Sequence, residues 1–191
     1  MNDYMVEETT GRVGVRYRSI VVWIHWITAL LVVTQVVIGF KFADMARGPE
    51  RMDAFSWHKT VGATILVLSL VRLGVRLMNP PPPYPSDMAK WERFFAVWNH
   101  RIFYFLLIAL PLTGLAAVSG GATNGMVALR FGLALPAIPG VPKDNGFGDV
   151  HEVLVYTTLV LLVLHVSAAI KNQFFSRTAV ADRMPPFRAP R

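Results

Sequence analysis

Apolar residues gather in four long runs along the chain, and polar, proline-rich or glycine-rich stretches separate them. The runs occupy residues 19–40, 54–78, 98–119 and 149–175. Each is about 20 residues or longer, and at a rise of about 1.5 Å per residue a helix of that length crosses the hydrocarbon core of a bilayer. The pattern predicts an all-α integral membrane protein, a bundle of four transmembrane helices.

Proline and glycine mark where these helices should end. The second run should stop at Asn79, because the prolines at 80–83 cannot continue a helix. Pro111 falls inside the third run and predicts a kink. Residues 120–148 are rich in Gly and Pro, and their apolar inner part, 126–135, is too short to span a bilayer. We expect an interfacial or re-entrant piece there.

The basic residues predict the orientation of the chain. It divides into a polar N-terminal segment (1–18), a four-helix domain (19–175) and a C-terminal tail (176–191). A signal peptide is the alternative at the N-terminus, but the run 19–40 is longer than the apolar region of such a peptide. Thirteen of the 19 Lys and Arg residues fall on the side that holds both termini and the loop 79–97. The positive-inside rule then places both termini in the cytoplasm.

Composition narrows the chemistry. The chain is 53% hydrophobic and only 16% charged, whereas a soluble domain carries about 25% charged residues. It has no cysteine, which excludes disulfides, thiolate nucleophiles, iron–sulfur clusters and Cys-ligated zinc. The net charge of +7 does not favour nucleic acid, because the basic residues lie between the apolar runs as topology signals. Any metal must be bound by His, Met or carboxylates, and five histidines make a short list.

Four of the five histidines match in depth, in two pairs. His25 lies about 9 Å into the first helix from its cytoplasmic end, and His165 lies about 10 Å from the same surface on the fourth. His58 and His151 both stand at the outer starts of their helices. His151 and His165 are separated by 14 residues, which places them nearly on one helix face with a rise of about 21 Å between them. The fourth helix therefore offers one imidazole near each membrane surface.

Several functions are open to such histidines. A lone His in an apolar helix is often a hydrogen-bonded core residue, and a small transporter or structural bundle is the corresponding non-redox alternative. A proton relay would favour carboxylates inside the spans, but Asp149 and Glu152 stand only at the outer edge. Zinc or copper usually needs three or four ligands at one level. Two imidazoles on facing helices suit a six-coordinate haem iron, so the metal ligands we favour are the pairs His25/His165 and His58/His151.

Four stretches resemble the bacterial cytochrome b561 family as a set. They are SIVVWIHW around His25, WHKTVGATILVLSLVRLGVRL from Trp57, NHRIFYFLLIALPLTGL from Asn99 and DVHEVLVYTTLVLLVLH from Asp149. They cover roughly residues 19–170 and all four helices in order. The resemblance implies a bundle in the bacterial inner membrane with two haem b groups stacked across the bilayer. It matches the four paired histidines to the family's axial ligands.

The resemblance also implies an activity. Electrons would pass one at a time between an outer donor and ubiquinone. One family member that is an enzyme is a superoxide:ubiquinone oxidoreductase, and others look like electron carriers. The alternative is a haem b membrane-anchor subunit that relays electrons for a partner dehydrogenase or hydrogenase, with 120–148 as the docking surface. Some family members carry a basic residue just before the fourth-helix ligand. This chain has Gly148, Asp149 and Val150 there, so the resemblance does not extend to a basic, superoxide-attracting surface at that point.

Three further residues are candidates for cofactor binding. Arg72 is predicted to pair with a haem propionate or to serve a quinone site, with lipid phosphate as the alternative. Lys59 follows His58 and can reach an outer propionate or attract an anion. His100 opens the third helix without a free partner at its depth. It is either a hydrogen-bond donor to a quinone carbonyl or haem propionate or an interfacial residue. The second ring nitrogens of the axial histidines should donate to backbone carbonyls.

Overall fold

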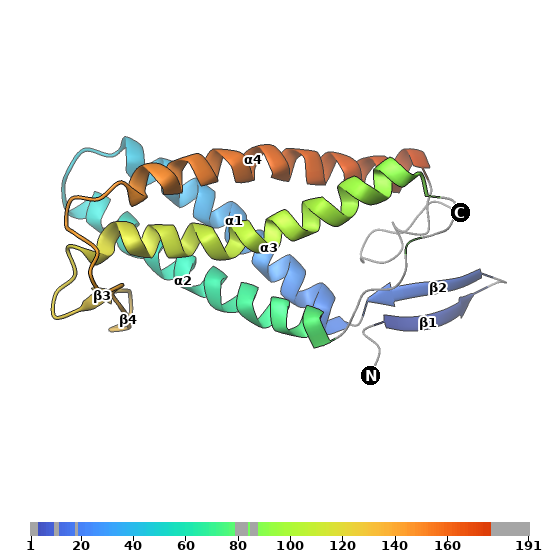
Figure 1. The fold of residues 1–191 in the computed structure, drawn as a ribbon, viewed down its shortest axis with the longest axis horizontal. Coiled ribbons are helices and arrows are strands. Elements are labelled where there is room, and N and C mark those ends of the chain that lie inside the picture. The colour runs from blue at the N-terminus through green and yellow to red at the C-terminus, as the bar shows by residue number, and fades with distance from the viewer. Residues whose placement is uncertain (1–3, 10–11, 18, 79–83, 85–87, 177–191) are drawn as a thin grey trace. The chain divides into compact units, whose positions relative to one another are not determined.

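Four long helices make up most of the structure. The computed structural model describes residues 4–9, 12–17, 19–78, 84 and 88–176. The helices are α1 (Ser19–Asp44), α2 (Pro49–Met78), α3 (Lys90–Ser119) and α4 (Phe147–Lys171), and a π-helical turn, η1 (Asn172–Ser176), follows α4 (Figure 1). All four are long and apolar enough to cross a membrane. The predicted four-helix membrane bundle is confirmed.

Three helices extend by four residues or more beyond the apolar runs. α1 continues to Asp44, α2 begins at Pro49 and α3 begins at Lys90. Hydropathy detects the part of a helix that suits hydrocarbon and misses the polar turns at its ends. Proline is tolerated in a first helical turn, where its missing N–H would have no partner within the helix. α2 ends at Met78 as predicted; the prolines at 80–83 lie outside the described residues, as does most of the predicted tail.

The chain forms two compact units, and each takes a segment from all four helices. The first unit consists of Met1–Trp26, Val71–Tyr104 and Thr158–Arg191. The second consists of Ile27–Leu70 and Phe105–Thr157. Each predicted histidine pair therefore falls within one unit, the inner pair in the first and the outer pair in the second.

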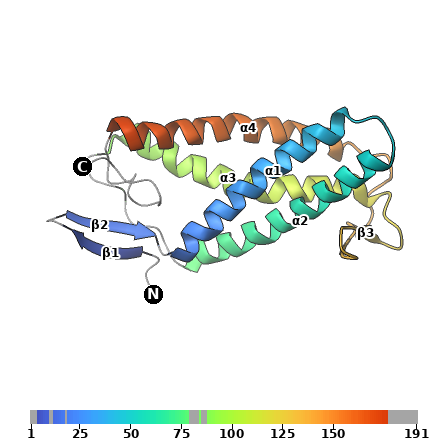
Figure 2. The same ribbon diagram turned by 180° about the vertical axis from the view of Figure 1, so that it is seen from behind.

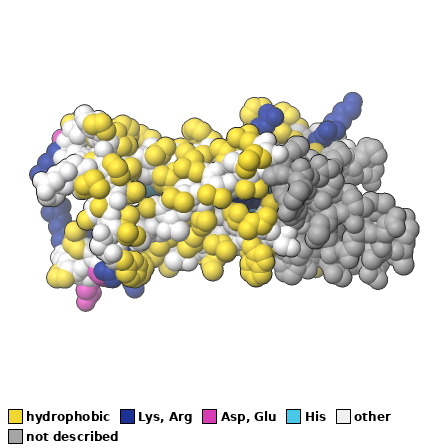
Figure 3. All heavy atoms as spheres, turned by 90° about the horizontal axis from the view of Figure 1, so that it is seen from below, with side chains coloured by type: hydrophobic (Ala, Val, Ile, Leu, Met, Phe, Trp, Pro, Cys, Tyr) yellow, Lys and Arg dark blue, Asp and Glu magenta, His cyan; other side chains and the backbone are white. Residues whose placement is uncertain are grey.

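Large apolar side chains face outward on every helix. The exposed fraction is 68% for Leu30 in α1, 58% for Val67 in α2, 65% for Phe105 in α3 and 62% for Val160 in α4. Figure 3 shows hydrophobic side chains predominating over the helices. The interior includes small polar residues such as Ser69, which is 1% exposed. Small and weakly polar interiors with apolar exteriors are typical of helices that pack within lipid.

Two short antiparallel hairpins accompany the helices. In the N-terminal segment, β1 (Tyr4–Thr9) pairs with β2 (Arg12–Tyr17). In the stretch that joins α3 to α4, β3 (Met126–Ala128) pairs with β4 (Ala134–Pro136), which Figure 2 shows from behind. Neither hairpin was predicted from the sequence.

The β3–β4 hairpin occupies the stretch over which we expected an interfacial or re-entrant piece, residues 126–135. Its connection uses residues in the left-handed region, with φ of 59° at Phe131 and 70° at Gly132. Gly132 adopts this conformation without steric cost, whereas Phe131 does so at some strain. When a short apolar stretch reverses direction, its two halves can pair, and the backbone N–H and C=O groups then bond to one another.

Candidate functional site

The second unit brings together His58 of α2 and His151 of α4. Their ring centroids lie 6.1 Å apart and their planes are inclined by 78°. When two imidazoles bind the same iron from opposite sides, with each iron–nitrogen distance about 2 Å, the ring centroids lie about 6 Å apart. His58 is the tenth residue of α2, not part of its start as the shorter predicted helix implied. The spacing therefore admits one iron between the two rings.

Glycines leave room beside both rings. A Cβ atom at Gly39 would lie 3.2 Å from Cε1 of His58. One at Gly114 would lie 3.2 Å from Cε1 and Nδ1 of His151. These distances are shorter than ordinary van der Waals contact, so a larger residue at either position would push the ring aside.

A mainly apolar cavity of about 220 Å³ adjoins the pair, and both histidines line it. The hairpin segment contributes Val127, Leu129 and Leu135 to its wall. Gln35 of α1 also lines it and donates from Nε2 to the main-chain oxygen of His58 at 3.0 Å. Its Oε1 is buried without a hydrogen-bond partner within the described part of the chain. The cavity is thus mainly apolar, with few polar groups in its wall.

The second ring nitrogen of His151 has the predicted kind of partner. Its Nδ1 lies 2.9 Å from the carbonyl oxygen of Leu110 and 3.3 Å from Oγ1 of Thr113. A carbonyl only accepts, so the proton belongs on Nδ1 and Nε2 keeps its lone pair for a metal. The Thr113 hydroxyl donates to the same carbonyl at 2.9 Å. The backbone-carbonyl prediction is confirmed for His151. It is not met at His58, whose Nδ1 is buried without a hydrogen-bond partner among the described residues.

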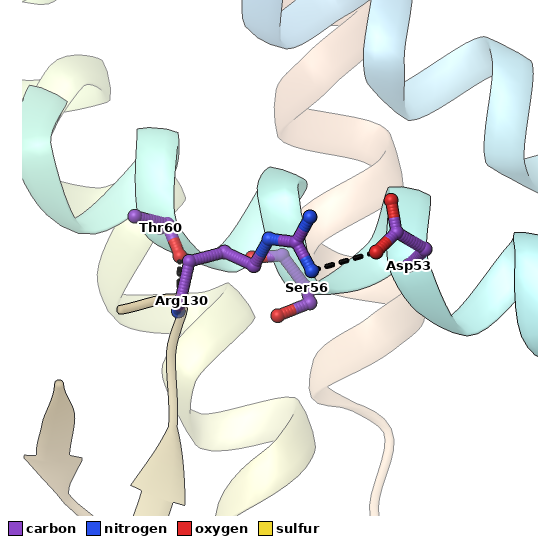
Figure 4. A network of polar contacts seen from close by, with 4 residues as sticks. All are labelled: Asp53, Ser56, Thr60 and Arg130. Carbon is purple, nitrogen blue, oxygen red and sulfur yellow. Dashed lines mark hydrogen bonds and ion pairs between the residues drawn. The ribbon is translucent and has the colours of Figure 1, made fainter. Parts of the chain in front are cut away.

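Arg130 links the segment that holds the β3–β4 hairpin, residues 126–136, to α2 by polar contacts (Figure 4). Its Nη1 lies 2.6 Å from Oδ1 of Asp53, and its backbone N–H donates to Oγ1 of Thr60 at 2.9 Å. Its guanidinium carbon lies 4.8 Å from the ring centroid of Trp57, next to His58. The wall that the hairpin gives the cavity is therefore tied to the helical turns around His58.

Lys59 is placed at the same cavity. Its side chain lines the wall, and the ammonium lies 5.3 Å from the ring centroid of Phe55. It supplies a positive charge beside the His58/His151 pair, which suits an anionic group at the cavity edge.

In the first unit, His165 of α4 contacts α3. Its Nδ1 lies 2.9 Å from Oδ1 of Asn99. Its ring centroid lies 5.3 Å from that of Phe103 and 5.7 Å from that of His100. The acceptor for His165 is thus a side-chain amide, and the prediction of a backbone carbonyl is wrong here.

His100 is not where the sequence reading placed it. It is the eleventh residue of α3, because residues 90–97 add about two helical turns before it. Its ring meets edge to face that of His165, the histidine that we pair with His25. Its Nδ1 lies 2.6 Å from the carbonyl oxygen of Ala96, and the side chain keeps exposed surface. Its Nε2 is the nitrogen left for another partner.

His25 of α1 and Arg72 of α2 belong to the same unit. The ring of His25 packs edge-on against that of Trp26, with centroids 5.3 Å apart. Nδ1 of His25 and Nε of Arg72 are buried without a hydrogen-bond partner among the described residues. The Arg72 guanidinium lies 5.7 Å from the ring centroid of Tyr104. A buried guanidinium N–H without an acceptor suits a carboxylate such as a haem propionate.

The donor set fits haem better than a free metal ion. In the described part of the chain, no three His, Cys, Asp or Glu side chains are grouped so as to hold a metal ion. A b-type haem brings its own four nitrogens and needs two axial ligands. In the second unit the facing imidazoles of His58 and His151 meet that need, with Gly39 and Gly114 beside the rings. In the first unit the unpartnered nitrogen of Arg72 suits a propionate.

Comparison with known proteins agrees with this reading. The family model described as prokaryotic cytochrome b561 matches residues 16–186. A probable superoxide oxidase CybB of Yersinia pestis is 27% identical over 177 residues, which cover 90% of this chain and 96% of the relative. Cytochrome b561 homolog 2 of Escherichia coli (strain K12) is 26% identical over 88% of this chain and 90% of its own length. Four membrane-spanning helices and a family match over most of the sequence show that the chain belongs to the prokaryotic cytochrome b561 family of membrane electron-transfer proteins.

Proposed function

We propose that this protein carries single electrons across the membrane by means of two b-type haems. Each haem is held by one histidine of α4 and one of another helix, in the pairs His58/His151 and His25/His165. Family membership implies haem b, which when bound supplies a centre that gains and loses one electron. The observation that carries the proposal is the facing pair His58/His151, with centroids 6.1 Å apart beside an apolar cavity.

The chain's own residues have three tasks in this function. The histidines hold the irons, and the bond from Nδ1 of His151 to the Leu110 carbonyl fixes the ring orientation. Arg72 and Lys59 neutralise propionates, one in each unit. The apolar walls exclude water, which keeps an imidazole neutral and available as a ligand.

We propose ubiquinone as the electron partner at His100. The Nδ1 of this residue is occupied by the Ala96 carbonyl, which leaves Nε2 for a quinone oxygen. The side chain is exposed and beside His165, so a lipid-soluble quinone can approach it from the bilayer. The proposed donor is outer, and superoxide is the candidate suggested by the relative from Yersinia pestis.

We propose that the protein lies in the bacterial inner membrane with both termini in the cytoplasm. The 13 basic residues that accompany the termini and the loop 79–97, against six on the other side, support this orientation. The β3–β4 hairpin would then be periplasmic.

Haem stoichiometry and quinone reduction test the proposal. The purified protein should show a reduced b-type α-band and two haems per chain. His165→Ala and His151→Ala should each lose one haem and keep the other, and His100→Ala should keep both but slow electron exchange with ubiquinone. A chain with fewer than two haems, or retention of both in His165→Ala, would contradict the pairing.

A further inference from the structure

α3 provides no axial ligand in the proposed function, yet it contacts both histidines of α4. His151 meets a main-chain oxygen, that of Leu110, at 2.9 Å. His165 meets a side-chain oxygen, Oδ1 of Asn99, also at 2.9 Å. The partner of one histidine is therefore set by the backbone and the partner of the other by the identity of one residue.

A hydrogen bond at Nδ1 changes the electronic character of an imidazole that binds iron through Nε2. The acceptor draws the Nδ1 proton and makes the ring a more basic ligand. A more basic ligand stabilises the ferric state over the ferrous state, so the reduction potential falls as the acceptor grows stronger. A carboxylate is a stronger acceptor than an amide, and an alkyl group is none.

We propose that Asn99 is a positioning residue that fixes the ring of His165 and, through this bond, sets the reduction potential of the haem that His165 holds. The inference rests on the proposed function, since it requires a haem at His165. It assigns α3 the role of tuning the two haems separately, one through a substitutable side chain and the other through the main chain.

The location of Asn99 supports this role. Its side chain is half-buried in α3, within the same unit as His165 and Arg72. Removing its amide leaves the part-buried Nδ1–H of His165 without its acceptor, which costs free energy. Thr113 occupies the comparable position beside His151, but there the Leu110 carbonyl remains after any change of side chain.

The experiment is a redox titration of the haem-loaded protein with three variants. Asn99→Leu removes the acceptor without adding charge, Asn99→Asp strengthens it, and Thr113→Val is the matched control at the other histidine. Asn99→Leu should raise one midpoint and Asn99→Asp should lower the same one. Each should change the ratio of reduced to oxidised haem at a fixed potential by about tenfold, which for one electron is about 59 mV. Thr113→Val should move only the other midpoint, and by less.

A second measurement separates tuning from simple packing. The low-spin ferric EPR signal depends on the angle between the two axial imidazole planes, so Asn99→Leu should shift one of the two signals. Shifts of opposite sign in the Leu and Asp variants support the proposal. Midpoints that stay unchanged with both haems present overturn it, as do shifts of the same sign or loss of a haem from both Asn99 variants. Wild-type protein with two haems keeps the proposed function standing in each of these cases.

Discussion

Replacing Arg130 should loosen the β3–β4 hairpin from α2 and expose the outer cavity to water more often. Arg130→Ala removes the contact with Asp53 and the stacking on Trp57. It leaves the backbone N–H that donates to Thr60. The hairpin should therefore remain folded and open locally, without general unfolding of the helices.

The exposure of these groups sets the size of the effect. The side chains of Arg130 and Asp53 are 33% and 53% exposed, and an ion pair in that setting contributes about 0.5 kcal/mol. The cation–π contact with Trp57 adds about 0.5–1 kcal/mol. Together these give about 1–1.5 kcal/mol, which raises the population of the locally open state roughly tenfold.

Hydrogen exchange of the backbone amides in 126–136 measures this population. Arg130→Ala should speed exchange roughly tenfold, whereas Asp53→Asn should speed it only about twofold because the stacking on Trp57 remains. Lys143→Ala removes a basic residue of the same loop outside this network and should leave exchange at the wild-type rate. Exchange in Arg130→Ala within twofold of wild type would refute the assignment of the ion pair and the stacking as the fastening of the hairpin.

Two glycine substitutions test packing directly. Gly120→Ala should destabilise the protein by on the order of 2 kcal/mol, because the new Cβ would overlap main-chain atoms of Pro142; thermal denaturation measures it, and an unchanged midpoint would count against the close approach. Gly114→Ala should displace the ring of His151, from which its Cβ would lie 3.2 Å away, and should lower haem retention or shift the α-band. Gly121→Ala, whose Cβ would meet its nearest atom at 3.8 Å, is the control for both and should resemble wild type.

The membrane-spanning parts of the helices were predictable, and their ends were not. Apolar runs are selected by the hydrocarbon itself, so they reveal which segments cross it. α1 continues to Asp44, α2 begins at Pro49 and α3 begins at Lys90. These additional turns contain polar residues, so hydropathy does not predict them. The sequence does contain a local turn signal, because Asn124 is followed by Gly125 and both have positive φ. Hydropathy alone does not detect such a turn.

The same division holds for the site. His58 and His151 were matched by depth because each lies in a helix whose direction the loops fix, and their rings do face each other. His100 was misplaced because the true start of α3 is polar. Asn99 gave no signal, since a lone amide near a membrane surface is common; its contact with His165 depends on how two helices meet, which periodicity within one helix does not encode.

Both compact units include a segment of α4, which is synthesised after α1, α2 and α3. His58 is therefore translated 93 residues before His151, an interval of roughly 5–20 s at the usual rate of elongation. During that time the early helices hold single, unmatched imidazoles in the membrane. In the proposed function, stable capture of either haem then follows insertion of α4, which makes completion of this helix the event that times maturation of the protein.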